Sequence, residues 1–376
     1  MPIATESRTA LKELIKLLTE VDERWSSEEW NLASTEDIAG SHRALMHILE
    51  AGLVGNFEQD PRKPNFRRIV TPSRKLTGDN SDAIYFDAPV HPDYSYVIHG
   101  QLNGAAYFSL TIEEGAENGG IATRTAGVIN DADMDFDESG GFTVYLGGTA
   151  KERNWLPMSP GASRVTTRHY WELQHCAAGD PTLEPRLVIE CLSDPAVPAP
   201  AVPAPADDTS IAAGIRRVSN FVRSRTLEMP PMANSEPPPF VALTPNEFPA
   251  PQLPGDYGLS AADAHYSMAP FFINADEALV ISGRWPSCRF ANVCLWNRFQ
   301  QTYDYSNRRS SLNRAQTELE SDGSFKIILA NSDPGKPNWI DTEGNLFGMV
   351  FWRFFLVEGE VETPVAEVMK LSDLRD

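Results

Sequence analysis

The sequence is poor in cysteine, in basic residues and in long apolar runs, and each shortage excludes a class of protein. Four cysteines occur in 376 residues, and their spacing fits neither a zinc site nor a disulfide framework. We therefore expect reduced thiols in the core of a cytoplasmic protein. No apolar run approaches the ~20 residues that a membrane-spanning helix needs. The first residues also lack the basic and apolar segments of a signal peptide.

Basic residues are outnumbered, 32 against 52 acidic ones, which gives a formal net charge of -20. A negatively charged surface repels nucleic acid and anionic membranes. We expect neither as a partner and expect a small-molecule ligand instead, while self-association stays open. Hydrophobic residues make up 41% of the chain, which at this length suits a globular protein with two or three domains.

Motifs that hold cofactors or metals are also missing. The chain has no His-Glu-x-x-His, no Gly-x-Ser-x-Gly and no glycine-rich phosphate loop between a strand and a helix, so we expect no cofactor. The run Asp131–Glu138 places aspartates on alternate positions, but a calcium loop would also need glycine sixth and glutamate twelfth. Those positions hold Phe136 and Phe142. We interpret the run as a solvated loop; the sequence does not decide whether it binds a cation.

What the chain does contain is a long internal repeat. Three residue pairs recur 183 residues later and a fourth recurs after 184: Ile98-x-Gly100 as Ile281-x-Gly283, Asn130-x-Ala132 as Asn313-x-Ala315, Gly140-x-Phe142 as Gly323-x-Phe325, and Asn154-Trp155 as Asn338-Trp339. A fixed offset over this length indicates one structural unit used twice.

Helical stretches and a proline-rich spacer lie outside the repeat. Residues 5–25 have apolar residues at helical spacing, Ser26-x-x-Glu29 is a candidate capping box, and a further helix begins near residue 36. Residues 195–206 combine proline with alanine and valine, which predicts an extended spacer. A helix over 209–228 follows, with four arginines that either bind an anion or, as is commoner, pair with carboxylates: Arg216, Arg217, Arg223 and Arg225.

Runs rich in β-branched and aromatic residues predict strands in both copies. In the first copy, runs at 94–98 and 106–112 flank Gly100–Gly104, which predicts a hairpin. Short strands without crossover helices are typical of antiparallel sandwiches. The predicted fold is mainly β, with tandem jelly-roll-like sandwiches, N-terminal helices and a central helix. The predicted domains are a helical region, a first sandwich, a proline-rich linker with one helix, and a second sandwich, at 1–78, 79–193, 194–255 and 256–376.

Seven short motifs lie in and around these strands. They are Asp79-Asn-Ser-Asp-Ala-Ile-Tyr85, Tyr94-x-Tyr-x-Ile-x-Gly100, Asp276-Glu-Ala-Leu-Val-Ile281, Leu295-Trp-Asn297, Ser311-Leu-Asn313, Asp322-Gly-Ser-Phe325 and Asp333-Pro-Gly-Lys-Pro-Asn-Trp-Ile-Asp-Thr342. In these motifs the chain resembles a bacterial family known as domain of unknown function 1214, from about residue 79 to the C-terminus. The resemblance implies a β-sandwich body and brings no catalytic residues with it.

Polar and aromatic residues gather at the ends of predicted strands in both copies, within 168–172 and 295–305. Such clusters can hold a ligand by stacking and hydrogen bonding, although aromatic residues in a sandwich are more often core. The candidate ligand-binding residues are Trp296, Asn297, Gln300, Tyr303, Tyr170 and Arg353. The candidate proton carriers, chosen as titratable groups, are Asp304, His169, Glu172 and Asp82.

Two functions from different classes fit these residues. The first is a cofactor-independent enzyme, a hydrolase or lyase, that acts on a small apolar or sugar-like metabolite by general acid–base catalysis in a cleft between the sandwiches. The second is a non-catalytic protein that binds a small molecule or carbohydrate. A buried carboxylate with a shifted pKa facing a pocket would favour the enzyme. An aromatic pocket without a titratable group would favour the binding protein.

Overall fold

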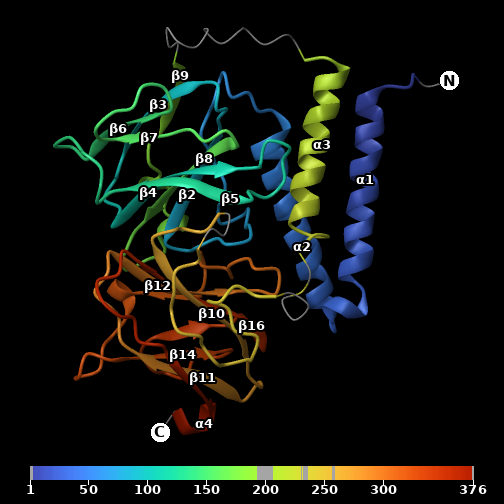
Figure 1. The fold of residues 1–376 in the computed structure, drawn as a ribbon. Helices are drawn as coiled ribbons and strands as arrows, with labels where there is room; N and C mark the ends of the chain where they lie inside the picture. Colours follow the sequence, from blue (N-terminus) through green and yellow to red (C-terminus); the bar gives the residue numbers. More distant parts are fainter. Residues whose placement is uncertain (1–2, 193–205, 230, 232–235, 256–258, 375–376) are drawn as a thin grey trace.

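The chain folds into four stacked β-sheets with helices along one side (Figure 1). The computed structural model describes residues 3–192, 206–229, 231, 236–255 and 259–374. The spacer expected at 195–206 therefore lies outside the described residues, apart from its last one. Within the described ranges, no helix is both long enough and apolar enough to cross a membrane.

The first unit is a sandwich of an inner and an outer sheet. The inner sheet has the order β1-β2-β8-β4-β5, with bounds Arg67–Arg68, Ala83–Pro89, Ala162–Tyr170, Tyr107–Glu114 and Arg124–Asn130. The outer sheet has the order β7-β6-β3-β9, with bounds Trp155–Leu156, Gly141–Leu146, Ser95–Gln101 and Val188–Leu192. Buried side chains such as Phe108 and Val144 fill the space between the two sheets.

The second unit repeats this architecture, except that its inner sheet has four strands where that of the first unit has five. Its inner sheet is β10-β16-β12-β13, with bounds Ala264–Phe272, Phe347–Phe355, Phe290–Trp296 and Ser311–Asn313. Its outer sheet is β15-β14-β11-β17, with bounds Trp339–Asp341, Phe325–Ala330, Glu277–Gly283 and Val365–Lys370. Each outer sheet even contains one parallel pair, β6 with β7 and β14 with β15, among otherwise antiparallel pairs. The predicted tandem sandwiches are confirmed.

The prediction that β3 and β4 form a hairpin is wrong. The intervening segment does turn tightly, since the Ala105 N–H donates to Leu102 O at 2.9 Å. However, β3 pairs with β6 and β9, whereas β4 pairs with β5 and β8 in the other sheet. The turn sequence specifies a reversal of direction and not the partner of the strand. Because β4 is buried on both faces, its place is in the inner sheet.

The repeated glycines make room for aromatic rings. Gly100 lies opposite Phe142 in the β3–β6 register, and Gly283 lies opposite Phe325 in the β11–β14 register. A Cβ atom on Gly100 would lie 2.4 Å from Phe142 Cζ, and one on Gly283 would lie 2.8 Å from Phe325 Cζ. The ring in each unit therefore lies over its glycine, which explains why both members of the pair recur.

The repeated Asn-Trp pair closes the outer sheet of each unit. Asn154 and Asn338 have left-handed φ angles of 50° and 57°, a conformation that asparagine tolerates better than most residues. Each asparagine donates from Nδ2 to two backbone carbonyls and accepts one backbone N–H. Trp155 and Trp339 then donate from Nε1 to carbonyls at 2.9 and 3.0 Å. Both indoles are partly buried.

The helices form a layer beside the stack. Helix α1 (Glu6–Trp25) packs on α3 (Asp208–Ser224), which also contacts α2 (Thr35–Gly52), as Figure 1 shows. A π-helix, η2 (Leu53–Phe57), continues α2. The capping box expected at Ser26 is not formed: the N-cap of η1 (Glu28–Trp30) is Ser27, without a side-chain cap. Short helices complete the described chain at η3 Ala177–Gly179, η4 Pro181–Leu183, η6 Arg314–Gln316 and α4 Leu371–Leu374.

We expect Gly100→Ala to destabilise the protein by ~1–3 kcal/mol, because the new methyl group overlaps the Phe142 ring. Gly283→Ala should cost less, since its contact is longer. Gly40→Ala is the control: its Cβ would meet nothing within 4 Å, and alanine is the better helix former. Urea unfolding measures all three; equal stabilities for Gly100→Ala and Gly40→Ala would contradict the prediction.

Candidate functional site

The two inner sheets pack face to face, so that the units share a third core. Tyr107 lies 4.3 Å from Phe355 between ring centroids, and Tyr170 lies 4.7 Å from Phe290. Residues from α1, α2 and α3 close the side of this core. Each inner sheet is therefore covered on one face by its own outer sheet and on the other by the inner sheet of the other unit.

His169 does not face this shared core. Its neighbour Tyr170 does, and successive residues of a strand point to opposite faces. The His169 ring lies 4.4 Å from Phe108 inside the first sandwich, and Nε2 is 3.3 Å from Gln101 O. Burial lowers the pKa of His169 to about 3, so the imidazole is neutral. This candidate acid–base residue lies in the hydrophobic core of the first unit.

Asp304 and Glu172 have structural partners instead. Asp304 lies in the loop after β12, where its carboxylate accepts from Asn307 Nδ2 at 2.8 Å and from Ser306 N at 3.2 Å. The bond from Asn307 is the main reason that the pKa of Asp304 is lowered. Glu172 accepts from Arg314 Nε at 2.7 Å and from a backbone N–H of β12 at 2.8 Å. Both contacts link Glu172, in the first unit, to the second unit.

Asp82 lies between the units with the rest of its motif. Residues 79–82 are at most 1% exposed. Asn80 and Asn292 exchange side-chain hydrogen bonds of 3.1 and 2.8 Å, and Asp82 Oδ2 accepts from Asn292 at 2.9 Å. Asp82 Oδ1 has no partner in the described part of the chain. Burial raises the pKa of Asp82 to about 7, although the Asn292 bond opposes the shift.

Asp79 and Lys75 extend this network. Asp79 accepts from the Thr302 N–H at 2.8 Å and from its hydroxyl at 2.6 Å. Lys75 Nζ donates to the Thr302 hydroxyl at 2.9 Å and to Tyr303 O at 3.0 Å, and it lies 3.4 Å from the centre of the Tyr305 ring. Burial lowers the pKa of Lys75 to about 8 and raises that of Asp79. Both side chains are buried.

Two candidate ligand-binding residues also join this network: Trp296 Nε1 donates to Asp79 O at 3.0 Å, and Arg353 Nη2 donates to Gly78 O at 3.0 Å. The hydroxyl of a third candidate, Tyr170, lies 2.8 Å from that of Tyr85. We call the following residues the inter-unit polar cluster: Lys75, Asp79–Asp82, Asn292, Thr302, Ser311 and Arg353. Each is at most 5% exposed, so the cluster lies where the sequence predicts a site but is closed to solvent.

The remaining candidates, Asn297, Gln300 and Tyr303, lie in or near the turn after β12. The segment is not helical. Asn297 Oδ1 accepts from Phe299 N at 2.9 Å and from Gln301 N at 3.2 Å, while Gln300 has a φ of 57°. The Tyr303 side chain is buried in the second sandwich. Asn297 therefore shapes the turn that presents Phe299.

Phe299 belongs to an open depression between the helices and the second unit, which the candidate ligand-binding residue Gln300 also lines. The sequence did not indicate the residues that the helices contribute to it. Phe299 lies 4.8 Å from Trp25 and 5.5 Å from Trp30 between ring centroids. The indole Nε1 groups of both tryptophans are buried without a partner among the described residues. We call this site the aromatic depression; its lining residues are Trp25, Trp30, Ile48, Thr77, Arg225, Met229, Pro231, Arg298, Phe299 and Gln300.

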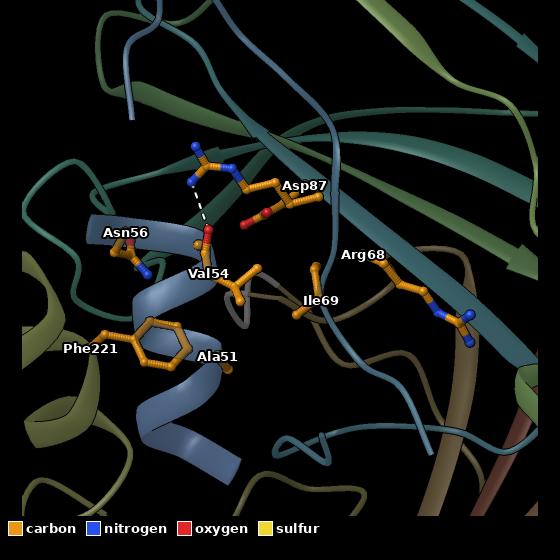
Figure 2. A pocket seen from close by; sticks show the side chains of 9 residues that line it. Ala51, Val54, Asn56, Arg68, Ile69, Asp87 and Phe221 are labelled. Carbon is orange, nitrogen blue, oxygen red and sulfur yellow. Dashed lines mark hydrogen bonds between the residues drawn. The ribbon is translucent and has the colours of Figure 1, made fainter. Parts of the chain in front are cut away.

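A second depression lies between η2, β1, β2 and α3. Figure 2 shows Asp87 pointing its carboxylate toward the end of the helix at Val54, while Arg68 extends away. Arg67 donates to Val54 O at 2.7 Å, the dashed line in Figure 2. Arg164 donates to Gly55 O at 2.7 Å and also pairs with Asp87.

The arginines around this second depression cap a helix end. Arg217 donates to Asn56 O and Phe57 O at 3.0 Å each, so carbonyls 54 to 57 all receive a guanidinium donor. The last carbonyls of a helix lack intrahelical donors and carry partial negative charge. Positive side chains at this place therefore need no ligand to explain them.

We expect Arg164→Met to destabilise the protein by ~2–4 kcal/mol, because it leaves Asp87 without its partner and removes a donor from the end of η2. Arg153→Met is the matched control. Its side chain is 53% exposed and pairs with Asp135 at the surface, so its loss should cost under ~1 kcal/mol. Thermal and urea unfolding report both; similar losses would rule out the capping role.

For Asp82, stability should depend on pH in a defined direction. Its folded carboxyl, with a pKa of about 7, keeps a proton that the unfolded chain has lost. The contribution of protonated Asp82 to the free energy of unfolding is therefore full below about pH 4 and is lost as the pH rises to about 7. Asp82→Asn keeps the shape of the protonated acid and should reduce the loss of stability between pH 5 and 7.5 by ~2–4 kcal/mol. Parallel pH profiles of wild type and variant would contradict this.

Comparison with known proteins supports the fold and does not assign an activity. An uncharacterized protein from Burkholderia cenocepacia has a TM-score of 0.83 at 24% identity, covering 97% of each chain. The VPA0106 protein from Vibrio parahaemolyticus is 12% identical, with 87% of this chain and 100% of that one covered, and its TM-score of 0.48 is too low to support a shared fold. No functionally curated protein matches the sequence. The chain resembles the family described as "Protein of unknown function (DUF1214)", whose model matches residues 83–174 in the first sandwich and 279–356 in the second.

Proposed function

We propose that the protein binds a small organic molecule in the aromatic depression without transforming it. The observation that carries this proposal is the composition of the lining: aromatic and aliphatic side chains with a few polar groups, and no carboxylate or histidine. Ligand sites are mostly apolar, with a small number of placed donors and acceptors that orient the ligand. A lining without a group that titrates near neutral pH suits binding better than acid–base catalysis.

The walls of the depression are held in place from both sides. Arg298 donates to Trp30 O and Asn31 O at 3.1 Å each and pairs with Asp37 at 3.2 Å. It thereby ties the short helix η1 to the turn that carries Phe299. Since its charge is already matched by Asp37, Arg298 positions the aromatic wall. A preformed wall lowers the entropic cost of binding.

An acid–base enzyme is the second candidate function. It is favoured by Asp82, whose pKa of about 7 suits a group that exchanges protons near neutral pH. Its substrate would have to reach the inter-unit polar cluster, whose side chains are at most 5% exposed. We therefore rank it below binding. Of the titratable candidates, only Asp82 combines burial between the units with a pKa near neutrality.

Binding is tested with two aromatic probes of nearly equal shape, 2-naphthoate and neutral 2-naphthamide, by isothermal titration calorimetry. We expect wild type to bind at least one, and Phe299→Ala to weaken that binding at least tenfold because the ring forms one wall. Phe299→Leu keeps most of the buried volume should the alanine variant unfold. Phe272→Ala removes a phenylalanine that is 52% exposed and should bind as wild type does. Binding unaffected by both Phe299 variants, or no binding by wild type, would refute the proposal.

A further inference from the structure

Arg225 is a buried cation without a carboxylate partner among the described residues. The side chain is 9% exposed. Its Nη1 donates to Phe221 O at 3.4 Å and Ser224 Oγ at 3.0 Å, both within its own segment, and the guanidinium lies 3.7 Å from the centre of the Phe221 ring. Burial, aided by the positive charge of Arg164 and opposed by the negative charge of Asp87, lowers the pKa of Arg225 to about 9.

The other three arginines of this segment have ordinary explanations. Arg216 pairs with Glu13 at 3.3 Å and Arg223 pairs with Glu20 at 3.7 Å, both on α1. Arg217 caps the end of η2. The expected pairing with carboxylates thus holds for two of the four. An unpaired buried charge is expensive and is normally compensated by a counter-ion, which is all the more notable in a chain with a net charge of -20.

Arg225 lines the aromatic depression together with Trp25 and Trp30. Building on the binding function proposed above, we infer that the ligand is an organic anion, an aromatic or alicyclic carboxylate. Its carboxylate pairs with Arg225, and its apolar body lies against the indoles and Phe299.

The charges of the lining favour a single carboxylate over a dianionic phosphate. Arg298, the second cation of the depression, is neutralised by Asp37. The positive charge of Arg225 is therefore the one that a bound ligand has to neutralise. A guanidinium offers a planar pair of donors that matches a carboxylate. A neutral sugar would leave the buried charge of Arg225 uncompensated.

The test compares 2-naphthoate with 2-naphthamide on four forms of the full chain by isothermal titration calorimetry. Wild type should bind the carboxylate at least tenfold more tightly than the amide. Arg225→Met should remove that preference and leave amide binding within about twofold, because the apolar walls remain. Arg225→Lys should keep part of the preference. Arg216→Met removes a 45% exposed arginine from α3, the helix whose C-cap is Arg225, and should behave as wild type, which excludes an effect of overall charge.

The outcomes separate this inference from the binding function on which it rests. Equal affinities of wild type for the two probes, or a preference that survives Arg225→Met, overturn the anion assignment and leave binding intact. A preference that falls equally in Arg216→Met also overturns it. Failure of wild type to bind either probe overturns both proposals. Melting temperatures check folding; Arg225→Met should not melt below wild type, since it removes an uncompensated buried charge.

Discussion

The face-to-face packing of the two inner sheets is the constraint on which the rest of the molecule depends. It buries both faces of strands such as β8 and β16. Strand β16 is accordingly almost wholly apolar, whereas β8 carries six polar residues among its nine. Water cannot satisfy polar groups in such a layer. Any that occur there must find partners across the interface or leave a costly unsatisfied atom.

The inter-unit polar cluster meets that requirement almost completely. The reciprocal bonds between Asn80 and Asn292 form in a single alignment of the two units, as does the bond from Trp296 to Asp79 O. We interpret the cluster as the feature that fixes how one sandwich is placed on the other. The same burial raises the pKa of Asp82, so an unusual pKa here follows from packing and is weak evidence for catalysis.

The duplicated body and the added helices contribute differently to the open site. The sandwiches supply the turn with Phe299, while α1, η1 and α2 supply Trp25, Trp30 and Ile48. The helical region has no counterpart in the second unit, so the internal symmetry of the body does not extend to the depression. The binding site that we propose therefore depends on the asymmetric addition, which positions aromatic walls on a rigid β scaffold.

The sequence by itself determined the repeat, the two sandwiches and the main helices, because these follow from local patterns: Gly100 must face a ring as Gly283 does, and Asn154 adopts the same left-handed turn as Asn338. Tertiary structure decided the partner sheet of β4, the face to which His169 points and the assembly of the depression. A shift of one residue moves a strand side chain to the opposite face, and turn chemistry does not select strand partners. Trp25, Arg225 and Phe299 come from segments far apart in the chain, and only packing brings them together.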